Sequence, residues 1–103
     1  LLIEKRLKGA LLGDFVIALF NPQSIERNWQ LKNAINLCLK SREGNTPVLV
    51  ARQVGRDNQS KKFFTLETIP FKEIDMLSII IIGNSQTTLV DEIFLTPRGY
   101  LQN

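Results

Sequence analysis

The segment that most restricts the fold of this chain is an apolar run within residues 78–87, which read SIIIIGNSQT. Its four consecutive isoleucines are β-branched and favour an extended backbone. Because no polar residue alternates with them, the run predicts a strand buried on both faces, as in sheets covered by helices on both sides. Gly83 then allows a close approach of the backbone. The polar residues that follow it indicate either a plain turn or a ligand-binding edge at the end of the strand.

Further patterns along the chain predict a single α/β domain over residues 1–103, with a mixed sheet of about five strands and helices packed on its faces. The first helix has an apolar face of Ile3, Leu7, Ala10 and Leu11 and stops near Gly13. The other elements are expected as strands at 14–20, 47–54, 61–69, 78–82 and 92–97, a helix at about 27–42 and one helical turn at 70–75.

The composition excludes several classes of function. The net charge of +3 comes from scattered lysines and arginines, without the basic stripe of a nucleic-acid binder. No apolar stretch is long enough to span a membrane, and no signal peptide is evident, so we expect a cytoplasmic protein. The chain has no histidine and a single cysteine, which rules out a histidine-based triad and predicts no metal site. Cys38 is expected to be a small buried hydrophobe.

Three of the predicted strands end in polar or glycine-bearing tips, which read ALFNP, ARQVGR and IIGNSQT. A strand–helix–strand crossover between the first two makes those two strands parallel. If the isoleucine strand runs the same way, all three tips lie on one rim of the sheet. Three such tips together favour a ligand-facing rim over a set of unrelated turns.

The segments DFVIALFNPQS, TPVLVARQVGR, IDMLSIIIIGNSQT and FLTPRGY, in this order, resemble the carboxyl-terminal half of the precorrin-3B C(17)-methyltransferases, a branch of the tetrapyrrole methylase family. The resemblance covers nearly the whole chain, and the pair GNSQT and TPRGY is its most specific part. Phe20 stands where the family more often has tyrosine. The family's amino-terminal domain, with its Gly-Pro loop, has no counterpart here, so the resemblance implies an excised second domain.

The resemblance implies that S-adenosyl-L-methionine binds in a cleft between two α/β domains. Carried over to this sequence, the cofactor-binding positions are the following: Phe20, Asn21, Gln53, Val54, Gly55, Ile82 and Gly83. Apolar side chains and free backbone groups suit an adenine ring. From the residues alone, Val54 and Ile82 are explained equally well as ordinary core. For Asn21, a place in a turn is the alternative to cofactor binding.

The implied substrate is a precorrin-3B-like tetrapyrrole that carries several carboxylates, which arginine binds through paired hydrogen bonds. The expected substrate-binding residues are Arg52, Arg56, Asn84, Ser85, Gln86, Thr96 and Arg98. Each arginine also has a simpler explanation as a solvated surface charge. No catalytic residue is assigned, because methyl transfer mainly needs alignment and exclusion of water.

Two functional interpretations stay open at this point. The first is the second domain of a methyltransferase of cobalamin (vitamin B12) synthesis, with its own amino-terminal domain as partner, a homodimer at full length, and inactive in isolation. The second is a non-catalytic binding or regulatory α/β module fused to another protein, since a fold does not determine a function. The coding sequence upstream of Leu1 separates them, because a Gly-Pro-rich loop after a first strand supports the enzyme.

Overall fold

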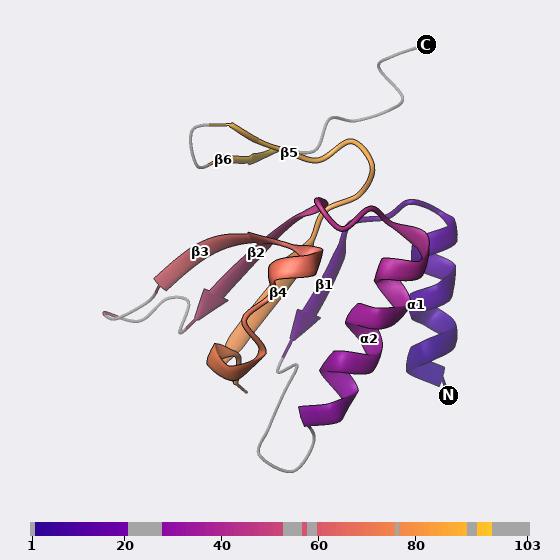
Figure 1. Cartoon of the computed structure of the whole chain (residues 1–103), viewed down its shortest axis with the longest axis horizontal. Coiled ribbons are helices and arrows are strands. Elements are labelled where there is room, and N and C mark those ends of the chain that lie inside the picture. Colours follow the sequence, from indigo (N-terminus) through magenta and orange to yellow (C-terminus); the bar gives the residue numbers. More distant parts are fainter. Residues whose placement is uncertain are drawn as a thin grey trace.

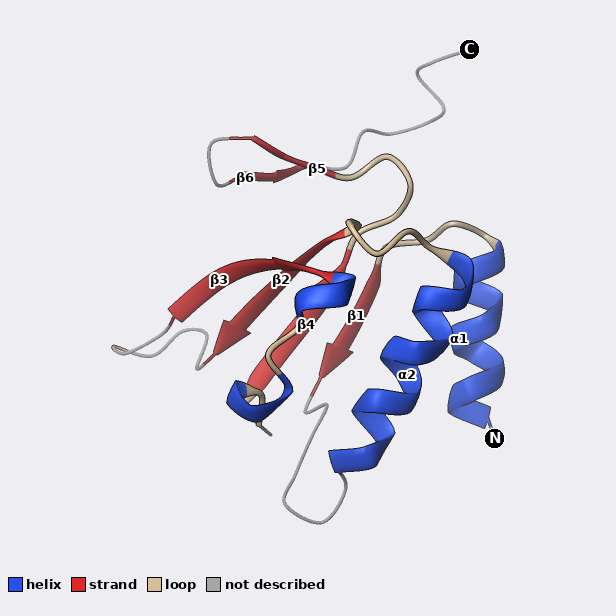
Figure 2. Ribbon diagram, in the orientation of Figure 1, coloured by secondary structure: helices blue, strands red, loops and turns tan. Residues whose placement is uncertain are grey.

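The computed structural model describes residues 2–20, 28–52, 57, 60–75, 77–90 and 93–95. Two α-helices lie beside a four-stranded sheet, and a small hairpin follows (Figure 1, Figure 2). In chain order the elements are α1 (Leu2–Leu12), β1 (Ile17–Phe20), α2 (Asn28–Ser41), β2 (Pro47–Arg52), β3 (Ser60–Thr65), the 3₁₀ turns η1 (Leu66–Thr68) and η2 (Phe71–Glu73), β4 (Ser78–Ile82), β5 (Thr88–Val90) and β6 (Ile93–Leu95).

The main sheet has the strand order β1-β4-β2-β3, and every neighbouring pair is antiparallel. The expected mixed sheet of about five strands is therefore wrong for the described residues. The isoleucine strand β4 lies between β1 and β2, and Ile82 pairs with Ile17 on one side and Val48 on the other. The chain reaches β4 through β3 and the two 3₁₀ turns, so it enters the sheet from the end opposite to the one predicted.

The direction of β4 overturns the expected single rim. β1 and β2 run the same way, as the crossover through α2 predicted, but β4 runs against both. The carboxyl ends of β1 and β2 consequently lie beside the amino end of β4, where Phe20 pairs with Ile79 and Arg52 with Ser78. The Gly83 end of β4 is at the opposite edge, about 13 Å away for four residue steps of extended chain.

One face of this sheet packs against both helices. Ile80, Ile82 and Val48 on that face are fully buried, and Leu7 of α1 and Ile35 of α2 pack in the same cluster. The predicted apolar face of the first helix is confirmed for Leu7 and Leu11, while the side chain of Ile3 lies outside the described residues. α2 buries Leu31 and Ile35, and Cys38 is fully buried as expected. Leu66 in η1 and two isoleucines beside η2, Ile69 and Ile74, close the same core.

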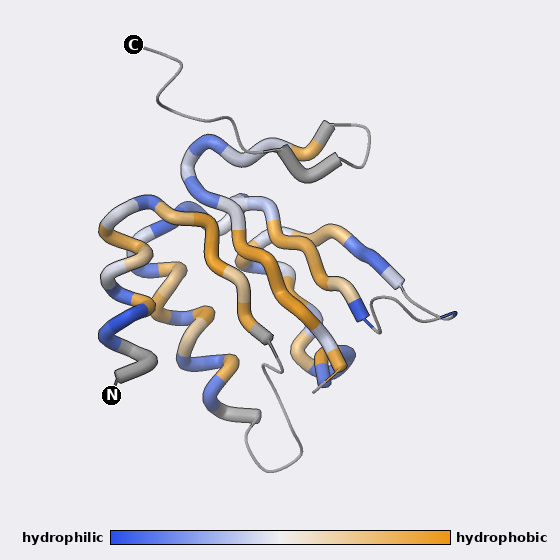
Figure 3. Tube along the Cα trace, turned by 180° about the vertical axis from the view of Figure 1, so that it is seen from behind, coloured by the Kyte–Doolittle hydropathy of each residue, from blue (hydrophilic) through white to orange (hydrophobic). Residues whose placement is uncertain are grey.

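The other face of the sheet has no helix over it among the described elements, as the view from behind shows (Figure 3). The register places Leu49, Phe63 and Ile81 side by side on that face. Burial alternates along β4: Ser78, Ile80 and Ile82 are buried, whereas Ile79 and Ile81 are only half-buried. The isoleucine run is therefore enclosed on one face, and the prediction of helices on both faces is wrong for this part of the chain.

Several boundaries differ from the sequence-based expectation. β1 begins at Ile17 rather than at 14, because Asp14 adopts a left-handed backbone conformation with φ of 59°. Asparagine and aspartate tolerate that conformation better than other side chains. β3 ends at Thr65, where the chain turns into η1 and buries Leu66. β5 was not predicted, and it pairs with β6 in a hairpin separate from the main sheet. No helix in the described ranges is long and apolar enough to cross a membrane.

Candidate functional site

The sequence-predicted site residues divide between two opposite edges of the sheet. The first is called here the β1–β2 edge, formed by the carboxyl ends of β1 and β2 and the amino end of β4, including Phe20, Arg52, Asp75, Leu77 and Ser78. The second is the β4–β5 turn, Gly83–Thr87. The two regions lie at opposite ends of β4.

At the β1–β2 edge, the guanidinium of Arg52 binds the carboxylate of Asp75. Nε and Nη2 of Arg52 donate to Oδ2 of Asp75 at 3.0 and 2.7 Å. The hydrogen bonds from Arg52 hold the pKa of Asp75 below its ordinary value, and burial opposes this only in part. The same contact raises the pKa of Arg52. Both side chains are about two-fifths exposed, so water screens the pair and its net stabilisation is small.

Asp75 is also held by its own loop. Its Oδ1 accepts from the backbone N–H of Leu77 at 2.9 Å and from Oγ of the buried Ser78 at 3.3 Å. An open groove of about 300 Å³ lies next to the pair, and its lining also includes Lys62, Glu73 and Phe64. Leu77 exposes 44% of its surface at this edge, so the amino end of β4 presents an apolar side chain beside a fixed charge pair.

The β4–β5 turn answers why the isoleucine run ends in small polar residues. A Cβ on Gly83 would lie 2.6–2.8 Å from atoms of the Thr87 side chain, so only glycine fits that close approach. Asn84 Oδ1 accepts from the N–H of Gln86 at 2.8 Å, and the N–H of Asn84 donates to Oγ1 of Thr87 at 2.9 Å. These contacts confirm a turn, and they show that most of its polar groups are already hydrogen-bonded within it.

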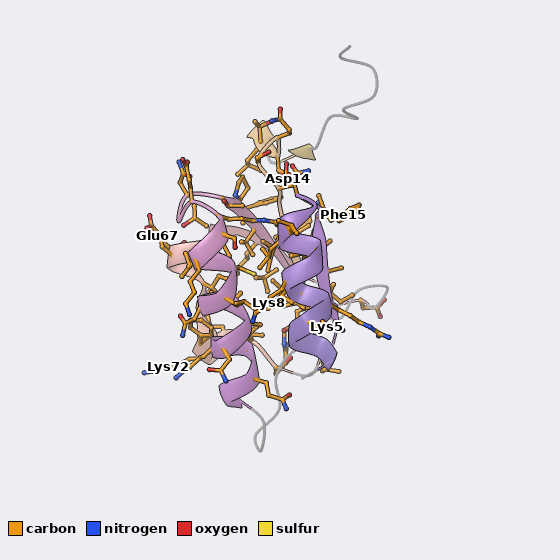
Figure 4. All side chains as sticks on the ribbon, turned by 90° about the vertical axis from the view of Figure 1, so that its right-hand side faces the viewer. Lys5, Lys8, Asp14, Phe15, Glu67 and Lys72 are labelled. Atoms are coloured by element: carbon orange, nitrogen blue, oxygen red, sulfur yellow. The ribbon has the colours of Figure 1, made fainter. Side chains whose placement is uncertain are left out.

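The same turn is fastened to the loop between α1 and β1. The carboxylate of Asp14 accepts from the N–H of Ser85 at 3.0 Å and from its hydroxyl, and Asn84 Nδ2 donates to the Asp14 carbonyl at 3.0 Å. Both bonds lower the pKa of Asp14, and the bond from the Ser85 hydroxyl has the larger effect. Asp14 and Phe15 sit together at the end of α1 nearest the hairpin (Figure 4).

Arg42, directly after α2, bonds both the β4–β5 turn and the loop between α1 and β1. Its Nη1 donates to the Gly83 carbonyl at 2.7 Å and its Nη2 donates to the Phe15 carbonyl. The Gly83 N–H donates to the Pro47 carbonyl at 2.9 Å, so both backbone groups of Gly83 are already bonded. Ile82 is fully buried in the core. Neither residue offers a free group at this edge, although an open groove of about 560 Å³ runs along it past Arg42, Asn84 and Thr88.

The structure therefore places the expected site residues at two opposite ends of the sheet. Phe20 and Arg52 lie on the β1–β2 edge, whereas Ile82, Gly83, Asn84, Ser85 and Gln86 lie on the opposite one. Seven predicted residues fall outside the described ones: Asn21, Gln53, Val54, Gly55, Arg56, Thr96 and Arg98.

Sequence reasoning missed Asp75, Leu77 and Ser78, because it treated only the carboxyl end of β4 as a possible rim. One signal was present. Aspartate side chains in turns often accept a hydrogen bond from the backbone N–H two residues further along, as Asp75 does from Leu77.

Comparison with known proteins finds relatives that match nearly the whole of this chain. A probable cobalt-factor III C(17)-methyltransferase of Salmonella typhimurium is 41% identical over 98 residues, which cover 95% of this chain and 41% of that protein. The precorrin-3B C(17)-methyltransferase of Sinorhizobium is 34% identical over 103 residues, again covering 95% of the chain and 41% of the relative. No protein-family model matches the chain.

A crystal structure of the methyltransferase CobJ superposes with a TM-score of 0.86 at 30% identity, covering 93% of this chain and 40% of that one. The chain is thus homologous, over about 95% of its length, to the cobalt-factor III and precorrin-3B C(17)-methyltransferases. This confirms the resemblance seen in the sequence. The chain spans about two-fifths of the length of these relatives.

Proposed function

We propose that this chain is the second, carboxyl-terminal domain of an S-adenosyl-L-methionine-dependent precorrin-3B C(17)-methyltransferase, and that it forms one wall of the cofactor and tetrapyrrole cleft. The observation that carries the proposal is the superposition on CobJ over 93% of the chain at 30% identity. A module fused to an unrelated protein would not be expected to keep both the fold and this level of identity to a C(17)-methyltransferase.

The β1–β2 edge is the better of the two candidate positions for the cofactor. Residues 21 and 53–55 come directly after the last residues of β1 and β2 in the sequence, and exposed Leu77 adds an apolar side chain at the start of β4, the strand between β1 and β2. An adenosine needs such an apolar surface together with backbone donors and acceptors. The buried Ile82 and the fully bonded Gly83 do not fit a direct contact, and in this proposal they support the β4–β5 turn instead.

For the tetrapyrrole, Arg56, Thr96 and Arg98 stay as proposed contacts, together with Gln86, whose side chain is exposed. Asn84 and Ser85 are engaged with Asp14, so a substrate would have to compete with those bonds.

S-adenosylmethionine supplies the methyl group from its sulfonium when it is bound. The proposed tasks of this chain's own residues are to bind adenosine, to hold the tetrapyrrole in line with that methyl group and to exclude water.

Calorimetric titration with S-adenosylhomocysteine tests the proposal on this chain and on the full-length parent protein. One wall buries about half of the ligand surface that a closed pocket buries, so a micromolar site, about −8 kcal/mol, should weaken to the millimolar range in the isolated chain. The parent protein is expected to bind with micromolar affinity and to methylate precorrin-3B, while the chain alone does neither. Micromolar binding by the chain alone would contradict the shared cleft, and a parent protein without binding or methylation would contradict the function.

A further inference from the structure

The loop that contains Asp75 orients its carboxylate independently of Arg52. Oδ1 accepts from the Leu77 N–H at 2.9 Å and from the Ser78 hydroxyl at 3.3 Å, and the Asp75 N–H donates back to that hydroxyl at 3.2 Å. Ser78 is only 1% exposed, so its hydroxyl cannot turn away to water without leaving these groups unpaired. The loop therefore fixes Oδ1 and leaves Oδ2 as the free acceptor.

Arg52 directs two donors to that acceptor. Its Nε and Nη2 both bind Oδ2 of Asp75, and the backbone register already places Arg52 opposite Ser78. A substrate carboxylate that approached the Nε–Nη2 side of Arg52 would have to displace a carboxylate that belongs to the same chain and is held by its own loop. A tethered partner has an effective concentration that a free ligand rarely reaches.

We infer that Arg52 and Asp75 are a positioning pair that fixes the carboxyl end of β2 against the amino end of β4, and that Arg52 is not a ligand of the substrate carboxylates. The inference rests on the proposed function, because the pair affects the reaction only if the cofactor binds at the β1–β2 edge. Arg52 is the last residue of β2 and directly precedes residues 53–55 in the sequence, so a fixed Arg52 fixes the last described position before them.

Because the pair is partly exposed, its loss should affect the local opening of β2 more than the global stability of the fold. Ion pairs that are about two-fifths exposed contribute little to global stability. Loss of the pair should therefore leave the unfolding transition almost unchanged, while the end of β2 opens more often. A residue with a purely structural role would show the reverse, a lower stability without a selective effect on one ligand.

The test uses the parent protein with Arg52→Gln, Asp75→Asn and the double variant. Lys62→Gln and Glu73→Gln are matched controls, because both residues are exposed, line the same groove and lose the same charges. Three quantities are measured: amide hydrogen exchange across residues 48–56, affinity for S-adenosylhomocysteine, and KM for the tetrapyrrole at saturating cofactor.

We expect both single variants to speed exchange at the end of β2 and to weaken S-adenosylhomocysteine binding by about three- to ten-fold, the range of one charge-assisted contact after screening. The double variant should be no worse than either single one, since each already breaks the pair. The controls should stay within about two-fold, and KM should stay close to that of the wild type.

A rise in KM with Arg52→Gln but not with Asp75→Asn would overturn the inference and return Arg52 to substrate binding. Unchanged exchange in both variants would overturn it as well. If the wild-type parent binds no S-adenosylhomocysteine, the proposed function fails, but the exchange comparison between variants and controls still supports or refutes the pair.

Discussion

Gly83 gives the sharpest test of why the isoleucine strand ends where it does. In Gly83→Ala the new methyl group would lie 2.6 Å from Cβ, 2.7 Å from Cγ2 and 2.8 Å from Oγ1 of Thr87. Thr87 is 6% exposed and its Oγ1 accepts from the Asn84 N–H, so it cannot rotate away without losing that bond. Overpacking costs about 1–3 kcal/mol and the hydrogen bond about 1 kcal/mol.

Alanine also lowers the conformational entropy of the unfolded chain, and this stabilises the folded protein by about 0.4–1 kcal/mol. The net loss in the free energy of unfolding is therefore about 1–3 kcal/mol, which lowers the Tm of a chain of this size by roughly 4 °C or more. Thermal unfolding followed by circular dichroism measures this directly.

Gly9 provides the control of opposite sign. It lies in α1, and a Cβ there meets nothing within 4 Å. Gly9→Ala should stabilise the protein by about 0.5–1 kcal/mol, because glycine weakens a helix interior. If Gly83→Ala raises Tm as Gly9→Ala does, or leaves it unchanged, the close approach to Thr87 does not constrain the turn and the reasoning is refuted.

Two further predictions concern the other edge and the core. Ser85→Ala should destabilise the protein at pH 7, and the difference from the wild type should shrink as the pH falls below the ordinary Asp14 value of 3.8. The sign follows because a carboxyl with a lowered pKa stabilises the fold only while it is ionised, so an equal difference in urea unfolding at pH 3 would contradict it. Burial raises the pKa of the Cys38 thiol. A thiol reagent should therefore label Cys38 only at the rate of unfolding, and immediate labelling of the native protein would contradict its burial.

Local patterns in the sequence determined the helices and most of the strands. The apolar stripes Leu7 with Leu11 and Leu31 with Ile35 define their helices, because burial of one face imposes a 3.6-residue period. The isoleucine run marked a central strand, and the position of Gly83 marked its end. The resemblance carried by GNSQT and TPRGY was enough to indicate the homologous methyltransferases, because a specific combination of residues can be recognised without knowledge of the fold.

Only the tertiary structure decided the direction of β4, and with it the division of the candidate site. A strand reads the same in both directions, since its alternation and β-branching carry no polarity. The direction depends on the connection, and here β3 with two 3₁₀ turns brings the chain back to the β1–β2 edge. That return places Asp75 opposite Arg52 and sends Gly83 to the far edge beside Asp14. Contacts of this kind join residues 23 and 70 or more positions apart, so no local pattern in the sequence could reveal them.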